Sequence, residues 1–284
     1  MARRLPVLLM ALALAACEAP LDPIEPSSLV FAMSGYLDVT ADTQTVRVEP
    51  FAREAVSTPG PIDATVELVD PDGDRHAMTQ LVRDFPTGPG HLFWTTAPIE
   101  AGATYRVVAT DAAGATATAT VRMPDDADLA FELIDGPLFC PTLVAVTGAA
   151  RVVDVQARYR LEGPGRVGER YRFSKLASLR QSAAGTLDAT VYFGDDADVM
   201  EIDGLPGAYP VAAEFAVAVG TDDWPDVEGL TLEGALAAAE LGNVEHGTGF
   251  VGGVITRAIP FRPGYGLIPP FEGSGIEPEP CNSE

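Results

Sequence analysis

The sequence predicts a mainly β protein, and three observations lead to this prediction. The 284 residues are about the length of two domains, so more than one sheet is expected. There are 28 glycines and 24 prolines but only 7% aromatic residues, a mixture typical of short strands joined by turns. Many short segments alternate apolar and polar residues, as strands with one buried face do. Because 47% of the residues are hydrophobic, the chain has enough apolar side chains for packed cores.

The first 17 residues are typical of an export signal. Met1–Arg4 is basic and Leu5–Ala16 is apolar, but this apolar run is shorter than the about 20 residues of a membrane-spanning helix. The following Leu14-Ala15-Ala16-Cys17 resembles the lipobox of bacterial lipoproteins, which implies cleavage before Cys17 and lipid on its sulfur and amine. Several acyl chains would anchor the chain to a membrane without a transmembrane helix. An ordinary signal peptide with a chance cysteine is the alternative.

The chain is strongly acidic. There are 41 acidic and 18 basic residues, giving a net charge of −23, and Lys175 is the only lysine. This charge argues against binding to nucleic acid or to anionic lipid. Cleavage before Cys17 would leave 16 basic and 41 acidic residues, or −25. Such a composition indicates a high-salt habitat, in which short Debye lengths screen self-repulsion. A GC-rich genome is the alternative, but it accounts only for the missing lysines.

Composition divides the chain into five segments. Residues 1–17 form the signal peptide and residues 18–27 a proline-rich tether. Residues 28–123 form the first domain, and an acidic stretch beginning at Pro124 marks the start of the second, residues 124–262. Residues 263–284 form a tail rich in proline, glycine and glutamate.

The first domain is predicted to be an immunoglobulin-like β-sandwich. Seven or so short strands within about 95 residues are typical of a sandwich. Tyr105 follows a glycine turn at the start of a strand, which resembles the tyrosine corner of immunoglobulin-like domains, although an ordinary strand tyrosine is the alternative. The domain begins with the segment 29–33, which leads to 35–39, and the strands expected after it are 44–48, 64–69, 75–81, 91–94, 104–110 and 115–123.

The second domain is predicted to be β-rich with one short helix. The helix is expected over 231–241, with Thr231 as its N-cap and Gly242 just beyond its end. The expected strands are 152–161, 169–179, 186–193 and 211–219.

Two motifs resemble ligand-binding loops but lack the context these need. Gly247–Gly252 fits G-x-G-x-x-G, but a dinucleotide site needs a strand before it and a helix after it, whereas the predicted order is reversed. A close backbone crossing is therefore expected, and no cofactor. Asp70–Asp74 begins like a calcium loop, yet Leu81 stands where an EF-hand has glutamate, so a hairpin turn is expected, with a Ca²⁺ ligand as the alternative. Asp195–Asp198 and Asp222–Asp226 are expected to be solvated acidic loops.

No catalytic or metal-binding residues are predicted. His76, His91 and His246 are scattered, and the motifs of zinc proteases and serine hydrolases are missing. The predicted function is therefore non-enzymatic. A lipid-anchored hydrolase is the alternative, and three polar groups converging on a pocket near His246 would favour it.

A disulfide between Cys140 and Cys281 is also expected. With Cys17 lipidated these are the remaining thiols, and an exported chain meets an oxidising compartment. A buried Cys140 and a free Cys281 are the alternative.

The segment Asn243–Gly253 resembles a lipoprotein family of unknown function that is common in Bacteroidota. The likeness covers most of residues 28–262, including the 64–73 hairpin and the Gly102–Tyr105 corner, whereas Cys281 stands alone instead of in a richer cysteine cluster. Members often lie beside TonB-dependent receptors. The resemblance implies an accessory or binding lipoprotein of an outer-membrane uptake or surface system, with such a receptor as partner. Glu18, in place of aspartate after the cysteine, also favours the outer membrane, facing the periplasm or the cell surface.

Overall fold

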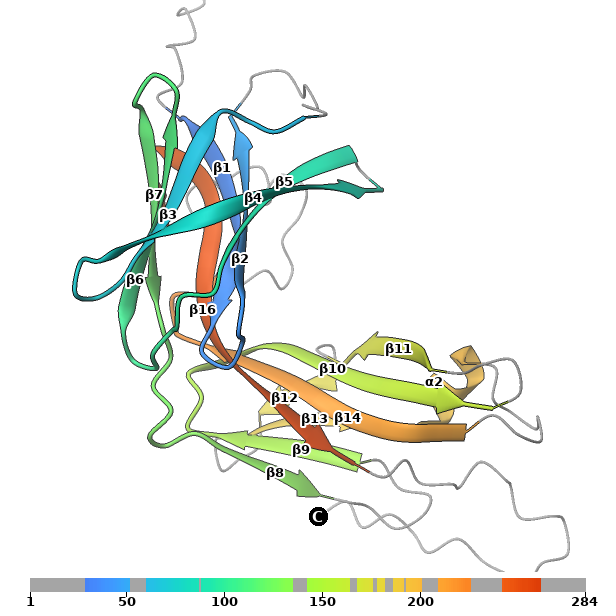
Figure 1. Ribbon diagram of the computed structural model, residues 1–284. Coiled ribbons are helices and arrows are strands. Elements are labelled where there is room, and N and C mark those ends of the chain that lie inside the picture. Colours follow the sequence, from blue (N-terminus) through green and yellow to red (C-terminus); the bar gives the residue numbers. More distant parts are fainter. Residues whose placement is uncertain are drawn as a thin grey trace, which may run out of the picture.

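The computed structural model confirms a mainly β protein. It describes residues 29–51, 60–86, 88–134, 142–163, 168–175, 178–181, 186–191, 193–200, 209–225 and 242–261. The strands fall into two groups that lie one above the other in Figure 1, and one long strand, β16, runs through both.

The first group surrounds one core, and the second group surrounds another. The first contains β1 (Phe31–Asp38), β2 (Gln44–Pro50), β3 (Ala64–Val69), β4 (Arg75–Phe85), β5 (Gly88–Thr95), β6 (Thr104–Asp111), β7 (Thr116–Arg122), β15 (Val244–Glu245) and the start of β16 (Gly247–Pro260). The second contains β8 (Ala130–Ile134), β9 (Thr142–Thr147), β10 (Arg151–Glu162), β11 (Glu169–Ser174), β12 (Arg180–Gln181), β13 (Leu187–Val191), β14 (Tyr209–Gly220), the end of β16 and the helix α2 (Phe193–Val199).

A sheet with the strand order β11-β10-β14-β16-β1-β2-β5-β4-β3-β6-β7-β15 connects both groups, and a second sheet has the order β12-β13-β9-β8. Strand β4 pairs with a different strand along each of its two halves, so the large sheet bends around the first core. Its residues 75–78 pair with β3, and its residues 79–85 pair with β5.

Alternation along the strands builds the first core, as the sequence predicts. Val46 and Val48 of β2 and Val107 and Ala109 of β6 are fully buried, and their neighbours in sequence point outward. The two consecutive segments 29–33 and 35–39 that open the first domain belong to one strand, β1.

Tyr105 makes the contact predicted for a tyrosine corner. The backbone N–H of Glu100 donates a hydrogen bond of 2.9 Å to the Tyr105 hydroxyl, and the ring is buried. Burial raises the pKa of Tyr105 and keeps the phenol neutral. The immunoglobulin-like topology as a whole stays a prediction.

Strand β16 serves both groups. It pairs parallel with β1 over residues 247–254 and antiparallel with β14 over residues 254–260, so Val251 reaches the first core and Ile255 the second. The predicted division at residue 124 assigns all of β16 to the second domain, and those domain limits stay a prediction.

The glycine run of β16 allows close backbone packing, as expected for a crossing. Gly249 has a φ of 99°, and a Cβ there would lie 2.1 Å from the Met33 carbonyl oxygen. A Cβ on Gly253 would lie 2.3 Å from the Arg122 carbonyl oxygen. The G-x-G-x-x-G pattern therefore belongs to a strand packed between neighbours.

The second core lies between the four strands β11, β10, β14 and β16 and the smaller sheet. Tyr159, Leu161, Phe215 and Val217 are buried in it. Three strands of the smaller sheet, β8, β9 and β12, were not predicted, and the strand predicted over 169–179 ends at Ser174.

The described helix, α2, is not the one predicted from the sequence. The expected helix at 231–241 lies outside the described residues, and α2 occupies the segment expected as the acidic loop Asp195–Asp198. That expectation was wrong because Ala197 and Met200 turn into the second core, which a solvated loop would not do. Within the described ranges, no helix has the length and apolar character needed to cross a bilayer.

Candidate functional site

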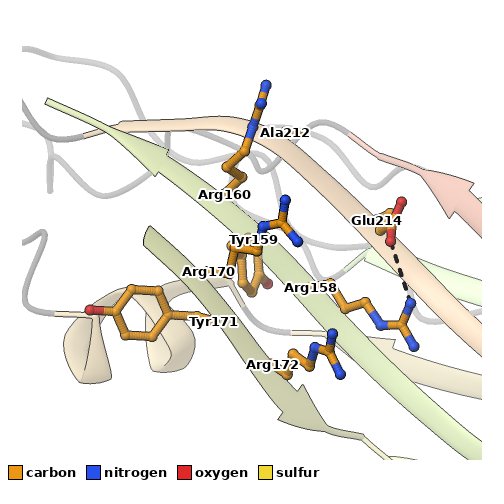
Figure 2. A pocket seen from close by; sticks show the side chains of 8 residues that line it. All are labelled: Arg158, Tyr159, Arg160, Arg170, Tyr171, Arg172, Ala212 and Glu214. Carbon is orange, nitrogen blue, oxygen red and sulfur yellow. Dashed lines mark ion pairs between the residues drawn. The ribbon is translucent and has the colours of Figure 1, made fainter. Parts of the chain in front are cut away.

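Four arginines gather on the outward face of the second group of strands. Arg158 and Arg160 come from β10, and Arg170 and Arg172 from β11. Each strand carries the sequence Arg-Tyr-Arg, so alternation turns the tyrosine toward the core and both arginines outward. These side chains line a hollow of about 290 Å³. Figure 2 shows how they lie, and we call this surface the arginine face.

Strand register places the arginines directly opposite one another. Arg158 pairs with Arg172, and Arg160 pairs with Arg170. Side chains at directly opposite positions have Cβ atoms about 5 Å apart, so like charges there repel and destabilise the sheet. The arginine face therefore concentrates positive charge on a chain whose net charge is −23.

Acidic side chains compensate this charge only in part. Glu214 of β14 lies opposite Arg158, and its Oε1 is 3.6 Å from Arg158 Nη1, as the dashed line in Figure 2 marks. Arg158 Nε also donates to Gln156 Oε1 at 3.1 Å. Across the described ranges Arg160, Arg170 and Arg172 form no ion pair, and all three are exposed.

A buried polar cluster lies on the opposite side of β10. The Tyr159 hydroxyl donates to Asp196 Oδ2 at 2.7 Å, and Lys175 Nζ forms an ion pair with Asp196 Oδ1. The Asp196 side chain is only 4% exposed and that of Lys175 15%. Burial, followed by the hydrogen bond to Asp196, raises the pKa of Tyr159 far above its usual range, so this phenol stays a donor.

Local structure fixes each member of this cluster. Lys175 directly follows β11, and its backbone N–H donates to the Val155 carbonyl at 2.7 Å, which holds the end of β11 against β10. Asp196 lies in the first turn of α2, where the positive end of the helix favours a carboxylate. The cluster thus joins α2 to the strands that carry the arginine face.

The described residues include few of the sites predicted from the sequence. Cys17, Cys140 and Cys281 all lie outside them, so the lipid anchor and the disulfide stay predictions. His246 is exposed in the turn between β15 and β16 with a φ of 55°, and its carbonyl oxygen accepts a hydrogen bond of 2.8 Å from Val30 N–H.

The loop Asp70–Asp74 forms the turn between β3 and β4. Asp70 Oδ1 accepts hydrogen bonds from the backbone N–H groups of Asp72 and Asp74, and Oδ2 lies 3.0 Å from His76 Nε2. The hydrogen bond with His76 is the main cause that lowers the pKa of Asp70. Within the described chain, no group of three or more His, Cys, Asp or Glu side chains is placed to hold a metal ion.

His91 is the most buried of the three histidines. Its Nδ1 lies 2.6 Å from Glu49 Oε2, and its Nε2 lies 2.9 Å from the Gly60 carbonyl oxygen. Burial opposes ionisation of Glu49, but hydrogen bonds from Arg47 and His91 hold its pKa below the ordinary value. His91 thus fastens β5 to β2 within the first group.

Neither the arginine face nor the polar cluster was predicted from the sequence. The face had a detectable signal, because Arg-Tyr-Arg occurs in two segments predicted as strands and alternation places both arginines of each on one side. The cluster had only a weak one, namely that Lys175 is the single lysine.

No protein-family model matches this sequence, and no curated protein matches it. Among solved structures, the chain is similar to two crystal structures of a pullulanase from Anoxybacillus sp. LM18-11, one of them complexed with maltotriose. Each is 13% identical over 68% of this chain, with TM-scores of 0.24 and 0.23. The chain spans 24% of the length of each pullulanase. Scores this low carry no argument about the function of this chain.

Proposed function

We propose that this chain is a non-enzymatic, lipid-anchored binding protein of the bacterial cell envelope. Its arginine face would hold an oxyanion group, a carboxylate or a phosphate, of a ligand or partner. One observation carries this proposal: the two arginine pairs lie directly opposite each other on the exposed side of β10 and β11, with Glu214 as the acidic neighbour.

Repulsion within the arginine face favours an anion. Opposed like charges destabilise a sheet, and a bound anion removes that repulsion. Guanidinium groups also suit oxyanions because each presents two parallel N–H donors to two oxygens. A ligand that contacts two of these arginines would therefore bind more tightly than a ligand that contacts a single, isolated surface arginine.

The negative charge on the rest of the chain opposes the approach of an anionic ligand from a distance. At physiological ionic strength charges are screened beyond about 8 Å, so the arginine face attracts anions only at short range. A net charge of −23 repels them at longer range. A partner on the same membrane is favoured, because shared anchoring raises its effective concentration.

Lipid on Cys17 would supply this anchoring. The lipobox Leu14–Cys17 and the following Glu18 support an outer-membrane lipoprotein that faces the periplasm or the cell surface. The resemblance to the Bacteroidota lipoproteins supports an accessory role in an uptake or surface system, with a TonB-dependent receptor as the proposed partner.

Titration calorimetry with two probes, pyrophosphate and citrate, tests the arginine face at low salt. We expect saturable binding of at least one of them, and the stronger probe identifies phosphate or carboxylate as the preferred group. The double variant Arg158→Gln/Arg172→Gln is expected to bind at least tenfold more weakly.

The control is Arg106→Gln/Arg122→Gln, which removes the same charge from exposed positions on β6 and β7. Its affinity should equal that of the unmodified chain. Equal weakening by both double variants would reduce the effect to net charge and overturn the proposed site, as would the lack of saturable binding to either probe.

Fractionation of cells tests the anchor. Replacing Cys17 by Ser should move the protein from the membrane fraction to the soluble fraction, or stop its processing. Unchanged membrane retention with normal processing would contradict the lipid anchor while leaving the arginine face to be judged by calorimetry.

A further inference from the structure

The strongest feature outside the arginine face is a row of side chains across the first group of strands. Strand register aligns Tyr36 of β1 with Thr45 of β2, Thr45 with Trp94 of β5, and Trp94 with Thr79 of β4. Directly opposite residues point to the same face of a sheet. All four are exposed, with Tyr36 at 54% and Trp94 at 36%.

Trp224 extends this row beyond Tyr36. The partner of Tyr36 on β16 is Gly252, and the Trp224 ring fills the space where a Cβ of Gly252 would lie, only 2.2 Å from its Cζ2. A Cβ on Gly220 would also lie 2.5 Å from the same ring. Two glycines thus form a slot for the indole.

Polar and aromatic contacts fix the Trp224 ring in this slot. Its Nε1–H donates to the Gly253 carbonyl at 3.0 Å, and Phe250 contacts it edge-on with centroids 5.1 Å apart. The ring stays partly exposed. Together Trp224, Tyr36, Thr45, Trp94 and Thr79 form what we call the aromatic row, which contains both tryptophans of the chain.

The aromatic row has no charged side chain, which indicates an uncharged ligand. No member of the row is charged, although the chain has 41 acidic residues. On the neighbouring row the charge of Arg47 is compensated by Glu49, whose Oε1 lies 2.8 Å from Arg47 Nε. A charged ligand would find no complementary group along the row.

The geometry of the row fits a chain of sugar rings. Neighbouring strands are about 4.8 Å apart, so Tyr36 and Trp94 are separated by about 10 Å, which is of the order of one disaccharide unit. A pyranose ring stacks its C–H face on an aromatic ring and presents hydroxyls at its edge, where Thr45 and Thr79 offer donors and acceptors. A lipid tail would leave these hydroxyls unpaired.

We propose that the aromatic row is a binding site for a neutral glycan chain of pyranose units, laid across β16, β1, β2, β5 and β4. This inference does not rest on the arginine face, which lies on β10 and β11 of the other group (Figure 1). It gives the protein a second contact in the envelope, toward a polysaccharide.

Native electrophoresis in gels containing soluble β-1,4-, β-1,3- or α-1,4-linked glucan tests the inference. We expect at least one glucan to retard the protein, and the linkage identifies the preferred chain. The double variant Tyr36→Ala/Trp94→Ala is expected to lose at least tenfold in affinity. The control Phe51→Ala removes a ring of similar exposure at the end of β2 and should bind normally.

Fluorescence keeps the test decisive if the double variant fails to fold. In Trp224→Phe the remaining tryptophan is Trp94, and saturating glucan should change its emission. Arg158→Gln/Arg172→Gln should leave glucan binding unchanged, which separates the two sites. Lack of binding to all three glucans, normal binding by a folded double variant, or glucan-independent self-association through this face would overturn the inference.

Discussion

Lys175 is the only lysine of the chain, and the structure gives it a buried partner. Its ammonium group pairs with Asp196, whose side chain is 4% exposed and also accepts the Tyr159 hydroxyl. Burying two charges is expensive, and their attraction compensates only while both are present. Removing one partner leaves the other charge buried alone, so the pair matters more for stability than its single contact indicates.

Replacing Lys175 by Met tests this interpretation. The variant keeps the unbranched shape and most of the length of the side chain but removes the ammonium group, which leaves the Asp196 carboxylate with the Tyr159 hydroxyl. We expect the free energy of unfolding to fall by about 3 kcal/mol, the effect of breaking a buried pair. The control Arg75→Met breaks an exposed pair with Glu67 and should lower it by less than about 0.5 kcal/mol. Urea unfolding of both variants measures the difference, and equal losses would contradict a buried role.

Glu49 makes stability depend on pH. Burial raises its pKa, but hydrogen bonds from Arg47 and His91 lower it more, so the folded-state pKa lies below the ordinary value of 4.5. A lowered carboxyl pKa contributes stability above the unfolded value, and this contribution disappears as pH falls through the folded value. Urea unfolding between about pH 6 and about pH 3 should show a smaller decline for Glu49→Gln than for the unmodified chain. Parallel declines would contradict this.

Residue-level prediction from sequence was weakest for the acidic side chains. The sequence places Asp196 in a solvated acidic loop, because its neighbours Asp195 and Asp198 give the segment a surface composition. Its burial depends on Lys175 and Tyr159, which lie 21 and 37 positions away. No local pattern could report these contacts.

At the scale of elements, alternation predicts the strands, and the turn at Asp70–Asp74 correctly predicts the pairing of β3 with β4, but the partners of strands far apart in the sequence were not predicted. The segments 64–69 and 104–110 were found almost to the residue as β3 and β6. The parallel pairing of β1 with β16 joins Phe31 to Gly247, and no hairpin turn links strands so far apart in sequence. The glycine run indicated a crossing but not its partner.

Gly249 shows how the glycine run sets this pairing. Gly249→Ala would combine a positive φ of 99° with a Cβ 2.1 Å from the Met33 carbonyl oxygen. Gly73 in the β3–β4 turn has a similar φ of 93° but open space around it, so Gly73→Ala measures backbone strain alone.

We expect Gly73→Ala to lower the free energy of unfolding by about 1 kcal/mol, and Gly249→Ala to lower it by a further 1–3 kcal/mol or so from overpacking. Thermal and urea unfolding measure both. If Gly249→Ala were no worse than Gly73→Ala, close packing between β16 and β1 would not be the reason for the glycine.

At the scale of the whole molecule, the sequence predicted the class of fold but not the surfaces that could bind. The arginine face and the aromatic row each need neighbouring strands in a fixed register. Tyr36 and Trp94 lie 58 positions apart in the sequence and share a face only through Thr45. Alternation gives the face of each residue within its own strand, whereas register is set by pairing across the sheet.

The net charge of the whole chain should make its stability depend on salt concentration. The net charge of −23, which the predicted cleavage before Cys17 would change to −25, makes the folded chain repel itself. The Debye length falls from about 10 Å in 0.1 M salt to about 3 Å in 1 M salt, which removes most repulsion between exposed carboxylates. The compact state gains more from this screening than the expanded unfolded chain, in which the charges are farther apart.

We therefore expect the midpoint of thermal unfolding to rise between about 0.1 M and about 2 M KCl. Parallel measurements in NaCl check that the effect is general, and sulfate is avoided because it also strengthens apolar burial. The buried Lys175–Asp196 pair is little screened, so Lys175→Met should show the same rise from a lower starting midpoint. An unchanged midpoint in both salts would contradict self-repulsion as a determinant of stability and would favour genome composition as the origin of the missing lysines.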